Sequence, residues 1–289
     1  MMYVEILEKG ESMRWIYYIG LISICALPLE ARVLIFTSLP YKNNAGIVED
    51  FAPMLRYLES DLNRSIEFRF EPSYQKLIAD FIDNKIDMAY MGPLPTLALM
   101  KQDASALPVV TFNDAKGKNG YRCVLVKFMP DMLMLEQPQT LKVALTEPLS
   151  TCGYFSTAPL VQAYAKAPLS TMHYRYVHKH DEVALSVLRG EFHLGGMKES
   201  IAESYRSLGL EIIAYSPIVP SFALVLNTKT LSPEQIEAIR TRLLNAPAKE
   251  YASWGKEISW GVQAVQTDTY RHMQFFSDIE SIPQEGNLR

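Results

Sequence analysis

The sequence predicts an α/β protein in which strands and helices alternate along most of the chain. Short apolar runs of strand length are followed repeatedly by segments whose apolar residues recur at helical spacing. Hydrophobic residues make up 48% of the 289 residues and charged residues 21%, a globular composition that excludes a disordered or collagen-like chain. The length suits one large domain or two domains of ordinary size.

Each expected element follows from a local pattern. Residues 33–36 form an apolar run that ends at Pro40, and residues 66–70 alternate between apolar and charged side chains, as a half-buried strand does. The remaining strands of the first series are expected at 87–90, 109–112 and 123–128, and its helices at 51–62, 74–82 and 97–100. In a second series, strands are expected at 141–145, 174–177 and 192–195, and helices at 154–166 and 181–189.

This alternation favours α/β layers with mostly parallel sheets. The loops at 114–120 and 130–138 are the expected breaks between two lobes.

The first 31 residues read as an export signal. Residues 15–29 carry no charge, Arg14 stands just before them, and Ala31 ends the run with a small residue. This is the order of a secretory signal peptide, and the apolar run is short for a membrane-spanning helix. The acidic residues upstream do not suit a signal peptide, so we expect translation to start at Met13. Because a signal peptide directs export, we expect the protein to be periplasmic. The alternatives are a membrane anchor and a buried N-terminal helix.

Charge and cysteine content exclude further classes. A formal net charge of −4 and a pI of about 5.8 argue against a nucleic-acid partner, which would require a basic surface. Export leaves Cys123 and Cys152 in an oxidising compartment, and their spacing leaves open whether they pair or stay free.

The most informative motif is Ser150-Thr151-Cys152-Gly153, between a predicted strand and a predicted helix. The start of a helix offers unpaired backbone N–H groups and a positive dipole end, so hydroxyl groups placed there favour binding of an oxyanion. Gly153 would let the backbone approach a bulky anion. The alternative is ordinary capping of the helix by Ser150 or Thr151.

A second polar cluster, at residues 178–181, also stands at an expected helix start. His180 there is a candidate donor to an anion, and the alternative is a solvated polar cap. No set of ligands at metal-binding spacing surrounds His178 and His180, so no metal is expected. No nucleophile elbow, phosphate loop or dinucleotide-binding motif is present, so we expect neither an enzyme nor a cofactor.

Several segments together resemble the PhnD-type periplasmic binding proteins for phosphate, phosphite and phosphonates. The similarity covers roughly residues 32–275, and the specific signal is the order of its motifs. The segments that carry it are Asp87 to Pro95 (DMAYMGPLP), Ser150 to Gly153 (STCG), His180 to Gly190, Gly195 to Ser200 (GGMKES) and Ser216 to Pro220 (SPIVP).

The resemblance implies a type II-like, two-lobed α/β binding protein of an ABC transporter, with the ligand in a cleft that closes about a hinge. Residues 32–125 would form the first part of lobe 1, residues 126–219 lobe 2, and residues 220–289 the return to lobe 1 with C-terminal helices. The ligand would be a small oxyanion and the partner an inner-membrane permease. The residues implied to surround the ligand are Ser150, Thr151, Cys152, His180, Tyr121, Tyr74, Gly92 and Pro93.

Three positions depart from the family pattern. Cys152 stands where a third hydroxyl is usual, His193 replaces an aspartate, and Ser221 replaces the acidic residue that aminoalkylphosphonate binders carry. The last departure argues against aminoethylphosphonate as the ligand.

The cysteines suggest an alternative function. A thiol at Cys123, close to the expected cleft, would be a ligand for a soft ion such as arsenite, in a periplasmic sensor that signals to a membrane histidine kinase. Cys123 packing as a small apolar residue is the simpler interpretation.

Overall fold

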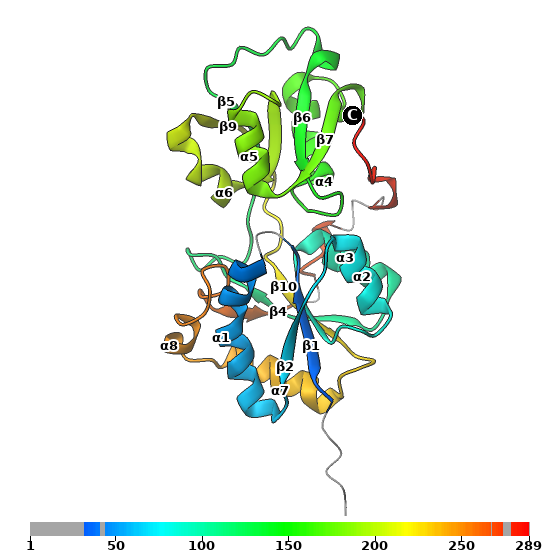
Figure 1. Ribbon diagram of the computed structural model, residues 1–289, viewed down its shortest axis with the longest axis vertical. Coiled ribbons are helices and arrows are strands. Elements are labelled where there is room, and N and C mark those ends of the chain that lie inside the picture. Colours follow the sequence, from blue (N-terminus) through cyan, green and yellow to red (C-terminus); the bar gives the residue numbers. More distant parts are fainter. Residues whose placement is uncertain (1–31, 41–43, 267, 274–278, 289) are drawn as a thin grey trace, which may run out of the picture. The chain divides into compact units, whose positions relative to one another are not determined.

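The computed structural model describes residues 32–40, 44–266, 268–273 and 279–288. The predicted signal peptide, residues 1–31, lies outside the described residues. The described chain forms two β-sheets, each flanked by its own helices (Figure 1). We call the six-stranded sheet and its helices lobe 1, and the five-stranded sheet and its helices lobe 2.

Lobe 1 takes its strands from two separate parts of the chain, residues 34–112 and residues 223–264. Its sheet has the strand order β11-β4-β10-β3-β1-β2. The strands are β1 (Leu34–Ser38), β2 (Ile66–Phe70), β3 (Met88–Met91), β4 (Ala106–Phe112), β10 (Ala223–Asn227) and β11 (Val262–Ala264). The helices are α1 (Asn44–Leu62), α2 (Tyr74–Ile82), α3 (Pro93–Gln102), α7 (Pro233–Leu244) and α8 (Ala248–Tyr251).

Lobe 2 is built from the middle of the chain, and its sheet has the order β7-β6-β8-β5-β9. The strands are β5 (Cys123–Phe128), β6 (Lys142–Thr146), β7 (His173–His178), β8 (Leu194–Lys198) and β9 (Leu210–Tyr215). The helices are α4 (Tyr154–Ala165), α5 (His180–Leu188) and α6 (Glu199–Ser204). Short 3-10 turns complete the described chain: η1 (Pro138–Thr140), η2 (Leu169–Thr171), η3 (Arg206–Leu208), η4 (Arg271–Met273) and η5 (Ile279–Ser281).

The elements predicted from the sequence are present, most of them with shifted ends, and the α/β class is confirmed. The expectation of mostly parallel sheets is wrong. Strands β1, β2 and β3 pair in parallel, as do β6, β7 and β8, but β10 runs antiparallel to both β3 and β4, and β5 runs antiparallel to both β8 and β9. The strand that follows each crossing between the lobes, β5 in lobe 2 and β10 in lobe 1, runs opposite to both strands with which it pairs, and β11 also runs antiparallel to β4.

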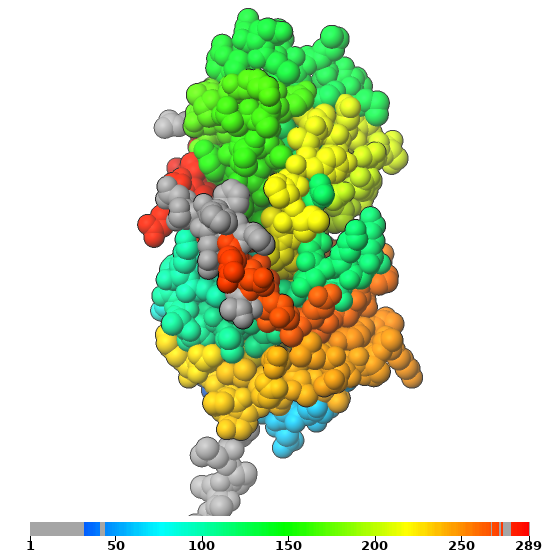
Figure 2. Space-filling view, turned by 180° about the vertical axis from the view of Figure 1, so that it is seen from behind, coloured from blue at the N-terminus to red at the C-terminus, as the bar shows by residue number. Residues whose placement is uncertain are grey.

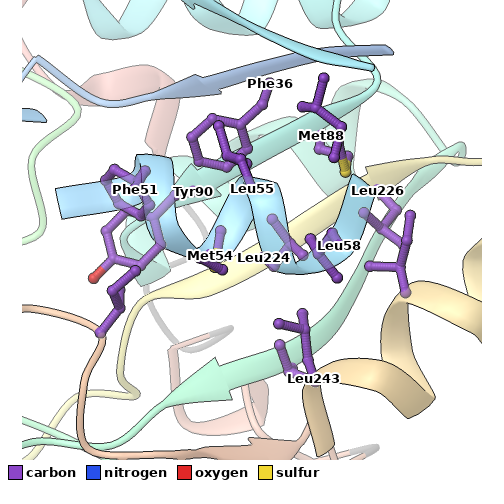
Figure 3. Packing of buried hydrophobic residues seen from close by; sticks show 14 of the residues in the cluster. Phe36, Phe51, Met54, Leu55, Leu58, Met88, Tyr90, Leu224, Leu226 and Leu243 are labelled. Atoms are coloured by element: carbon purple, nitrogen blue, oxygen red, sulfur yellow. The ribbon is translucent and has the colours of Figure 1, made fainter. Parts of the chain in front are cut away.

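Apolar side chains on both faces of each sheet hold the helices in place. On one face of lobe 1, Phe51, Met54, Leu55 and Leu58 of α1 pack on strand residues such as Phe36 (Figure 3). The spacing of these four residues is that of one helix face, which is why this segment forms an amphipathic helix. Burying each such side chain stabilises the fold by about 1.5–3 kcal/mol.

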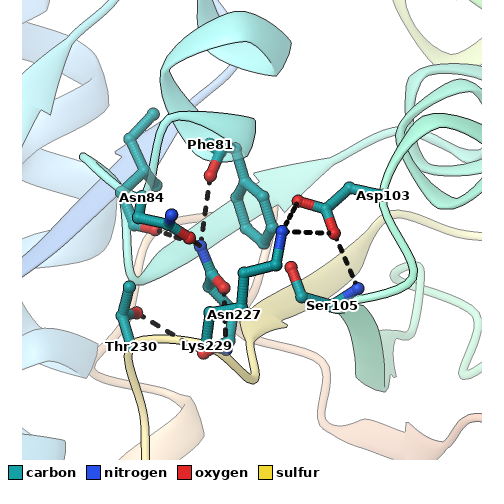
Figure 4. Close-up of polar contacts among 8 residues, drawn as sticks. Phe81, Asn84, Asp103, Ser105, Asn227, Lys229 and Thr230 are labelled. Atoms are coloured by element: carbon teal, nitrogen blue, oxygen red, sulfur yellow. Dashed lines mark hydrogen bonds and ion pairs between the residues drawn. The ribbon is translucent and has the colours of Figure 1, made fainter.

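The end of the returning strand β10 is fixed by polar contacts rather than by packing alone. The Asn227 side-chain amide donates to the Phe81 carbonyl oxygen at 3.1 Å, and its oxygen accepts from the Lys229 backbone at 3.0 Å (Figure 4). The Lys229 ammonium in turn pairs with the buried carboxylate of Asp103 at 2.9 Å. The strand is thereby tied to the ends of α2 and α3.

The last described residues belong to lobe 2, which corrects the expectation that the chain after residue 220 stays in lobe 1. The Leu288 backbone donates to the Tyr174 carbonyl oxygen at 3.0 Å, and the Asn287 side chain accepts from the Tyr174 backbone at 2.7 Å. Figure 2 shows this red C-terminal segment against the green segments of lobe 2. Among the described residues, no helix is both long and apolar enough to cross a membrane.

Candidate functional site

The chain passes between the lobes at residues 113–122 and again at residues 216–222. The two passages pair with each other: the backbones of Tyr121 and Val219 exchange two hydrogen bonds, of 3.0 and 2.9 Å. The expected break at 130–138 is wrong, because that loop joins β5 to β6 within lobe 2. The break expected at 114–120 lies within the first passage.

A small inner pocket of about 40 Å³ lies beside these passages, lined from both lobes. A water molecule needs roughly 10–15 Å³ by this measure, so the pocket suits a group of only a few non-hydrogen atoms. Its lining residues are Leu39, Tyr74, Tyr90, Gly92, Pro95, Tyr121, Ser150, Thr151, Cys152, His180, Lys198, Ile201, Phe222 and Glu257. Seven of the eight residues expected around a ligand are therefore together, and Pro93 is the exception.

The loop that carries Ser150 and Thr151 does not cap the following helix. Helix α4 begins at Tyr154 with Gly153 as its N-cap, and no side chain hydrogen-bonds to the cap. Both hydroxyl residues are buried and line the pocket. The capping interpretation is therefore wrong, and both residues line the cavity instead.

Gly153 has a different role from the one the sequence suggested. It does not line the pocket in the described structure. A Cβ atom at Gly153 would lie within 3.1 Å of the Ser150 carbonyl oxygen and closer still to that of Glu147. The glycine therefore allows the loop to fold tightly on itself, which brings Ser150 and Thr151 to the pocket.

Two buried tyrosines bring further hydroxyl groups to this loop. Tyr74, the first residue of α2, hydrogen-bonds to Ser150, and Tyr121 hydrogen-bonds to Thr151. Burial raises the pKa of both phenols, and the nearby Glu147 carboxylate raises the pKa of Tyr74 further. Both side chains are consequently neutral hydroxyl groups at physiological pH, able to donate.

His180 adds an N–H group from lobe 2. Its Nδ1 accepts a hydrogen bond of 3.1 Å from the Lys198 backbone, so the ring proton of the neutral form lies on Nε2. Burial, and to a smaller extent the Lys198 ammonium, lowers the pKa of His180 to about 3. His180 is therefore a neutral donor rather than a cation.

The other histidines named from the sequence lie elsewhere. His178 Nδ1 pairs with the Glu147 carboxylate at 2.8 Å, and His193 Nδ1 accepts from the Lys142 backbone at 2.9 Å. Neither lines the pocket. Within the described ranges, no group of three His, Cys, Asp or Glu side chains is arranged to hold a metal ion.

The opposite wall comes from the start of α3 in lobe 1. Pro93 and Pro95 lie in the first turn of this helix, with Gly92 as N-cap. Gly92 and Pro95 line the pocket, whereas Pro93 is buried outside it. The Leu94 backbone donates to the Thr151 hydroxyl at 3.1 Å, which joins the two walls.

Cys123 and Cys152 form a disulfide bond. The prediction of a free soft-ligand thiol at Cys123 is therefore wrong, and so is packing of Cys123 as a free residue. The bond fastens the Ser150–Thr151 loop to β5, next to the first passage between the lobes. An arsenite site at Cys123 would lack its thiolate.

Sequence reasoning missed three residues that distinguish this pocket: Lys198, Phe222 and Glu257. Lys198 falls inside the GGMKES segment, so a charged residue at the end of a buried strand was the available signal. Phe222 follows Ser221 in the second passage, and Glu257 lies after α8 in lobe 1. No local pattern marks either position, because only the fold brings them together.

A larger cavity of about 460 Å³ adjoins the inner pocket and shares its wall. The residues that line both are Tyr90, Tyr121, Lys198, Phe222 and Glu257. Ser221 lines only the larger cavity. These shared side chains form the wall between the inner pocket and the larger cavity, and the lining of the larger cavity includes several charged residues.

Comparison with known proteins identifies the family. Residues 36–268 match the family model described as the periplasmic substrate-binding protein of phosphonate ABC transporters. The chain belongs to this family. The resemblance seen in the sequence motifs is confirmed, and the family consists of solute-binding proteins rather than enzymes.

The individual relatives described next have low sequence identity to this member of the phosphonate-binding family. The phosphate-import protein PhnD of Mycolicibacterium smegmatis is 21% identical over 276 residues, which covers 86% of each chain. A phosphonate transporter binding protein of Pseudomonas aeruginosa has a similar fold, with a TM-score of 0.72, 20% identity and 86% coverage of each chain. PhnD1 of Prochlorococcus marinus, solved with methylphosphonate, gives a TM-score of 0.71 at 15% identity, covering 85% of this chain and 97% of that one. The two-lobed fold is thereby confirmed.

Proposed function

We propose that this protein binds a small phosphate-like oxyanion, such as phosphate, phosphite or methylphosphonate, in the inner pocket and delivers it to an inner-membrane ABC permease. The observation that carries the proposal is the convergence of neutral donors on one small pocket. Those donors are the hydroxyl groups of Ser150, Thr151, Tyr74 and Tyr121 and the Nε2–H of His180.

Physical chemistry supports an anion as the ligand. Neutral donors fixed in a buried pocket stabilise a negative charge without a matching buried cation at each contact. The pocket also lies at the N-terminal end of α4, where the Cys152 backbone and the helix dipole favour an anion. In this proposal Gly92 closes the opposite side, and its lack of a side chain leaves room for the ligand.

The names of the relatives agree with a small tetrahedral ligand, since one is a phosphate importer and another was solved with methylphosphonate. The volume of about 40 Å³ agrees with the same size class. Closure of the two lobes about residues 113–122 and 216–222 would then enclose the ligand.

Thermal unfolding with added anions tests this function. Phosphate, phosphite, methylphosphonate and arsenate are compared with sulfate and arsenite, and a ligand that binds only the folded protein raises the melting temperature. We expect at least one of the phosphorus oxyanions to raise it and arsenite to have no effect. Absence of a shift with every oxyanion would refute the proposal.

Variants assign the effect to the pocket. Replacing Ser150 and Thr151 together by alanine should abolish the shift. Ser156→Ala is the matched control, because Ser156 is a buried serine at the start of α4 that does not line the pocket. An equal loss of the shift in the control would show that the loop hydroxyl groups do not bind the anion.

We also propose that residues 1–31 are a signal peptide, with translation starting at Met13, and that the mature protein is periplasmic. The uncharged run at 15–29 and the small residue Ala31 support this. N-terminal sequencing of the periplasmic protein should begin at Arg32. Recovery of the protein only in membranes with an intact N-terminus would favour an anchor instead.

A further inference from the structure

Lys198 is the one residue with a full positive charge among the described residues that line the inner pocket. It is the last residue of β8, and its side chain is 17% exposed. The Nζ atom pairs with the Glu257 carboxylate at 3.0 Å. Because Lys198 belongs to lobe 2 and Glu257 to lobe 1, this ion pair joins the two lobes at the pocket wall.

Two aromatic rings complete the surroundings of this ammonium group. The Nζ atom lies 5.4 Å from the ring centroid of Tyr121 and 5.4 Å from that of Phe222. Aromatic faces combined with a carboxylate form the environment that recognises an alkylammonium group. In this protein a side chain of the protein itself, Lys198, occupies that environment.

The charge of this group matters for binding because the other candidate donors are neutral. A ligand anion in the pocket gains attraction from Lys198, and Glu257 compensates the ammonium when no ligand is bound. A ligand that carries its own ammonium group meets a like charge and has to compete for Glu257. The Glu257 side chain is 41% exposed, and an ion pair with a solvated partner adds little to stability, so we assign this pair a role in recognition.

We propose that Lys198 determines the charge class of the ligand: it strengthens binding of oxyanions without a cationic substituent and excludes aminoalkylphosphonates. This inference rests on the proposed oxyanion-binding function and refines it. The juxtaposition that carries it is Lys198 held between Tyr121, Phe222 and Glu257 beside Ser150 and Thr151.

Calorimetric titration with two probes tests the proposal. The wild-type protein should bind methylphosphonate at least about tenfold more tightly than 2-aminoethylphosphonate. Lys198→Met should weaken methylphosphonate by roughly tenfold and strengthen 2-aminoethylphosphonate, because Glu257 then becomes available to the ligand ammonium. Lys198→Arg keeps the charge and should keep the wild-type preference.

Lys256→Met is the matched control. It removes the same charge at an exposed neighbour of Glu257 that lines only the larger cavity. It should bind both probes as the wild type does. If Lys198→Met does not fold by circular dichroism, Lys198→Gln takes its place; the His180 contact with the residue 198 backbone remains in every variant.

The outcomes separate this inference from the proposed function. If the wild type binds neither probe nor inorganic phosphate, the proposed function itself fails. If the wild type binds methylphosphonate but Lys198→Met behaves like Lys256→Met, only the role of Lys198 is refuted. Binding of 2-aminoethylphosphonate by the wild type as tightly as methylphosphonate also overturns the proposal.

Discussion

The backbone N–H of Leu94 donates a hydrogen bond of 3.1 Å to the hydroxyl oxygen of Thr151, and both residues are buried. Leu94 lies in the first turn of α3 in lobe 1, and Thr151 lies before α4 in lobe 2. The Thr151 hydroxyl also forms a hydrogen bond with Tyr121 in the pocket wall. One hydroxyl group thus connects the lobes and faces the pocket.

Thr151→Val removes the hydroxyl group with little change in side-chain volume. It should therefore weaken both the contact between the lobes and the binding of the anion. We expect the affinity for methylphosphonate to fall by about tenfold or more, because a buried hydrogen bond to a charged group contributes roughly 1.5–3 kcal/mol. Thr151→Ser should restore most of the affinity. Calorimetric titration checks both variants, and unchanged affinity in Thr151→Val would exclude the hydroxyl from the site.

His180 should make the folded protein sensitive to acid. The pKa of His180 is about 3 when folded and near 6.5 when unfolded, so the unfolded chain binds the proton more readily. The stability that the neutral ring contributes is complete above about pH 6.5 and is lost as the pH falls toward 3. Each pH unit in this window costs up to about 1.4 kcal/mol.

Urea unfolding of wild type and His180→Gln between pH 7 and pH 4 measures this contribution by difference. The free energy of unfolding should fall less steeply with decreasing pH in the variant. Parallel pH profiles would mean that His180 titrates normally in the folded state, and that its ring is not the buried neutral donor of the site.

The disulfide bond between Cys123 and Cys152 should stabilise the fold and position the Ser150–Thr151 loop. Closing a loop with a sequence separation of 29 residues contributes about 3.5 kcal/mol on the chain-entropy model. Replacing both cysteines by serine should lower the free energy of unfolding by about that amount and weaken oxyanion binding. Thermal melts and titrations of the double variant measure the two effects.

Thiol counting checks the pairing directly. Denatured full-length chain has three cysteines, so it should react with one equivalent of a thiol reagent, at Cys25, before reduction and with three afterwards. Three reactive thiols without reduction would contradict the disulfide and restore the question of a soft-ion site.

The sequence predicted the elements from local patterns, and it predicted seven of the fourteen residues that line the inner pocket. Helix α2 and strand β5 have the predicted bounds, since each has a clear apolar period. Ser150, Thr151 and His180 were identified because polar residues at helix starts carry a local signal. Gly92, Tyr74 and Tyr121 were found through motif order rather than through any pattern of their own.

Local patterns could not predict contacts between residues that lie far apart in the sequence. The antiparallel entry of β10, the pairing of Cys123 with Cys152 and the contact between Lys198 and Glu257 each depend on the chain crossing between the lobes. Local spacing contains no information about those crossings. For the same reason the loop at 130–138, which joins β5 to β6 within lobe 2, was mistaken for a passage.

Gly153→Ala should destabilise the protein more than a surface glycine substitution would. The added Cβ atom would press on the backbone carbonyl oxygens of Glu147 and Ser150, which cannot move without opening the turn. Overpacking of this kind costs about 1–3 kcal/mol. The first hydrogen bond of α4, from the Thr157 backbone to the Gly153 carbonyl oxygen, should be disturbed as well.

Gly92→Ala is the informative contrast, because the Cβ atom at Gly92 would meet the Phe222 ring at 3.3 Å and the Thr151 hydroxyl at 3.7 Å. The Gly92 backbone angles, φ −69° and ψ 167°, are open to alanine. The melting temperature should stay near that of wild type while oxyanion affinity falls, since the methyl group enters the pocket. If Gly153→Ala keeps wild-type stability, the tight turn at Gly153 is not what positions the Ser150–Thr151 loop, and the disulfide bond and the Leu94 hydrogen bond have to hold it.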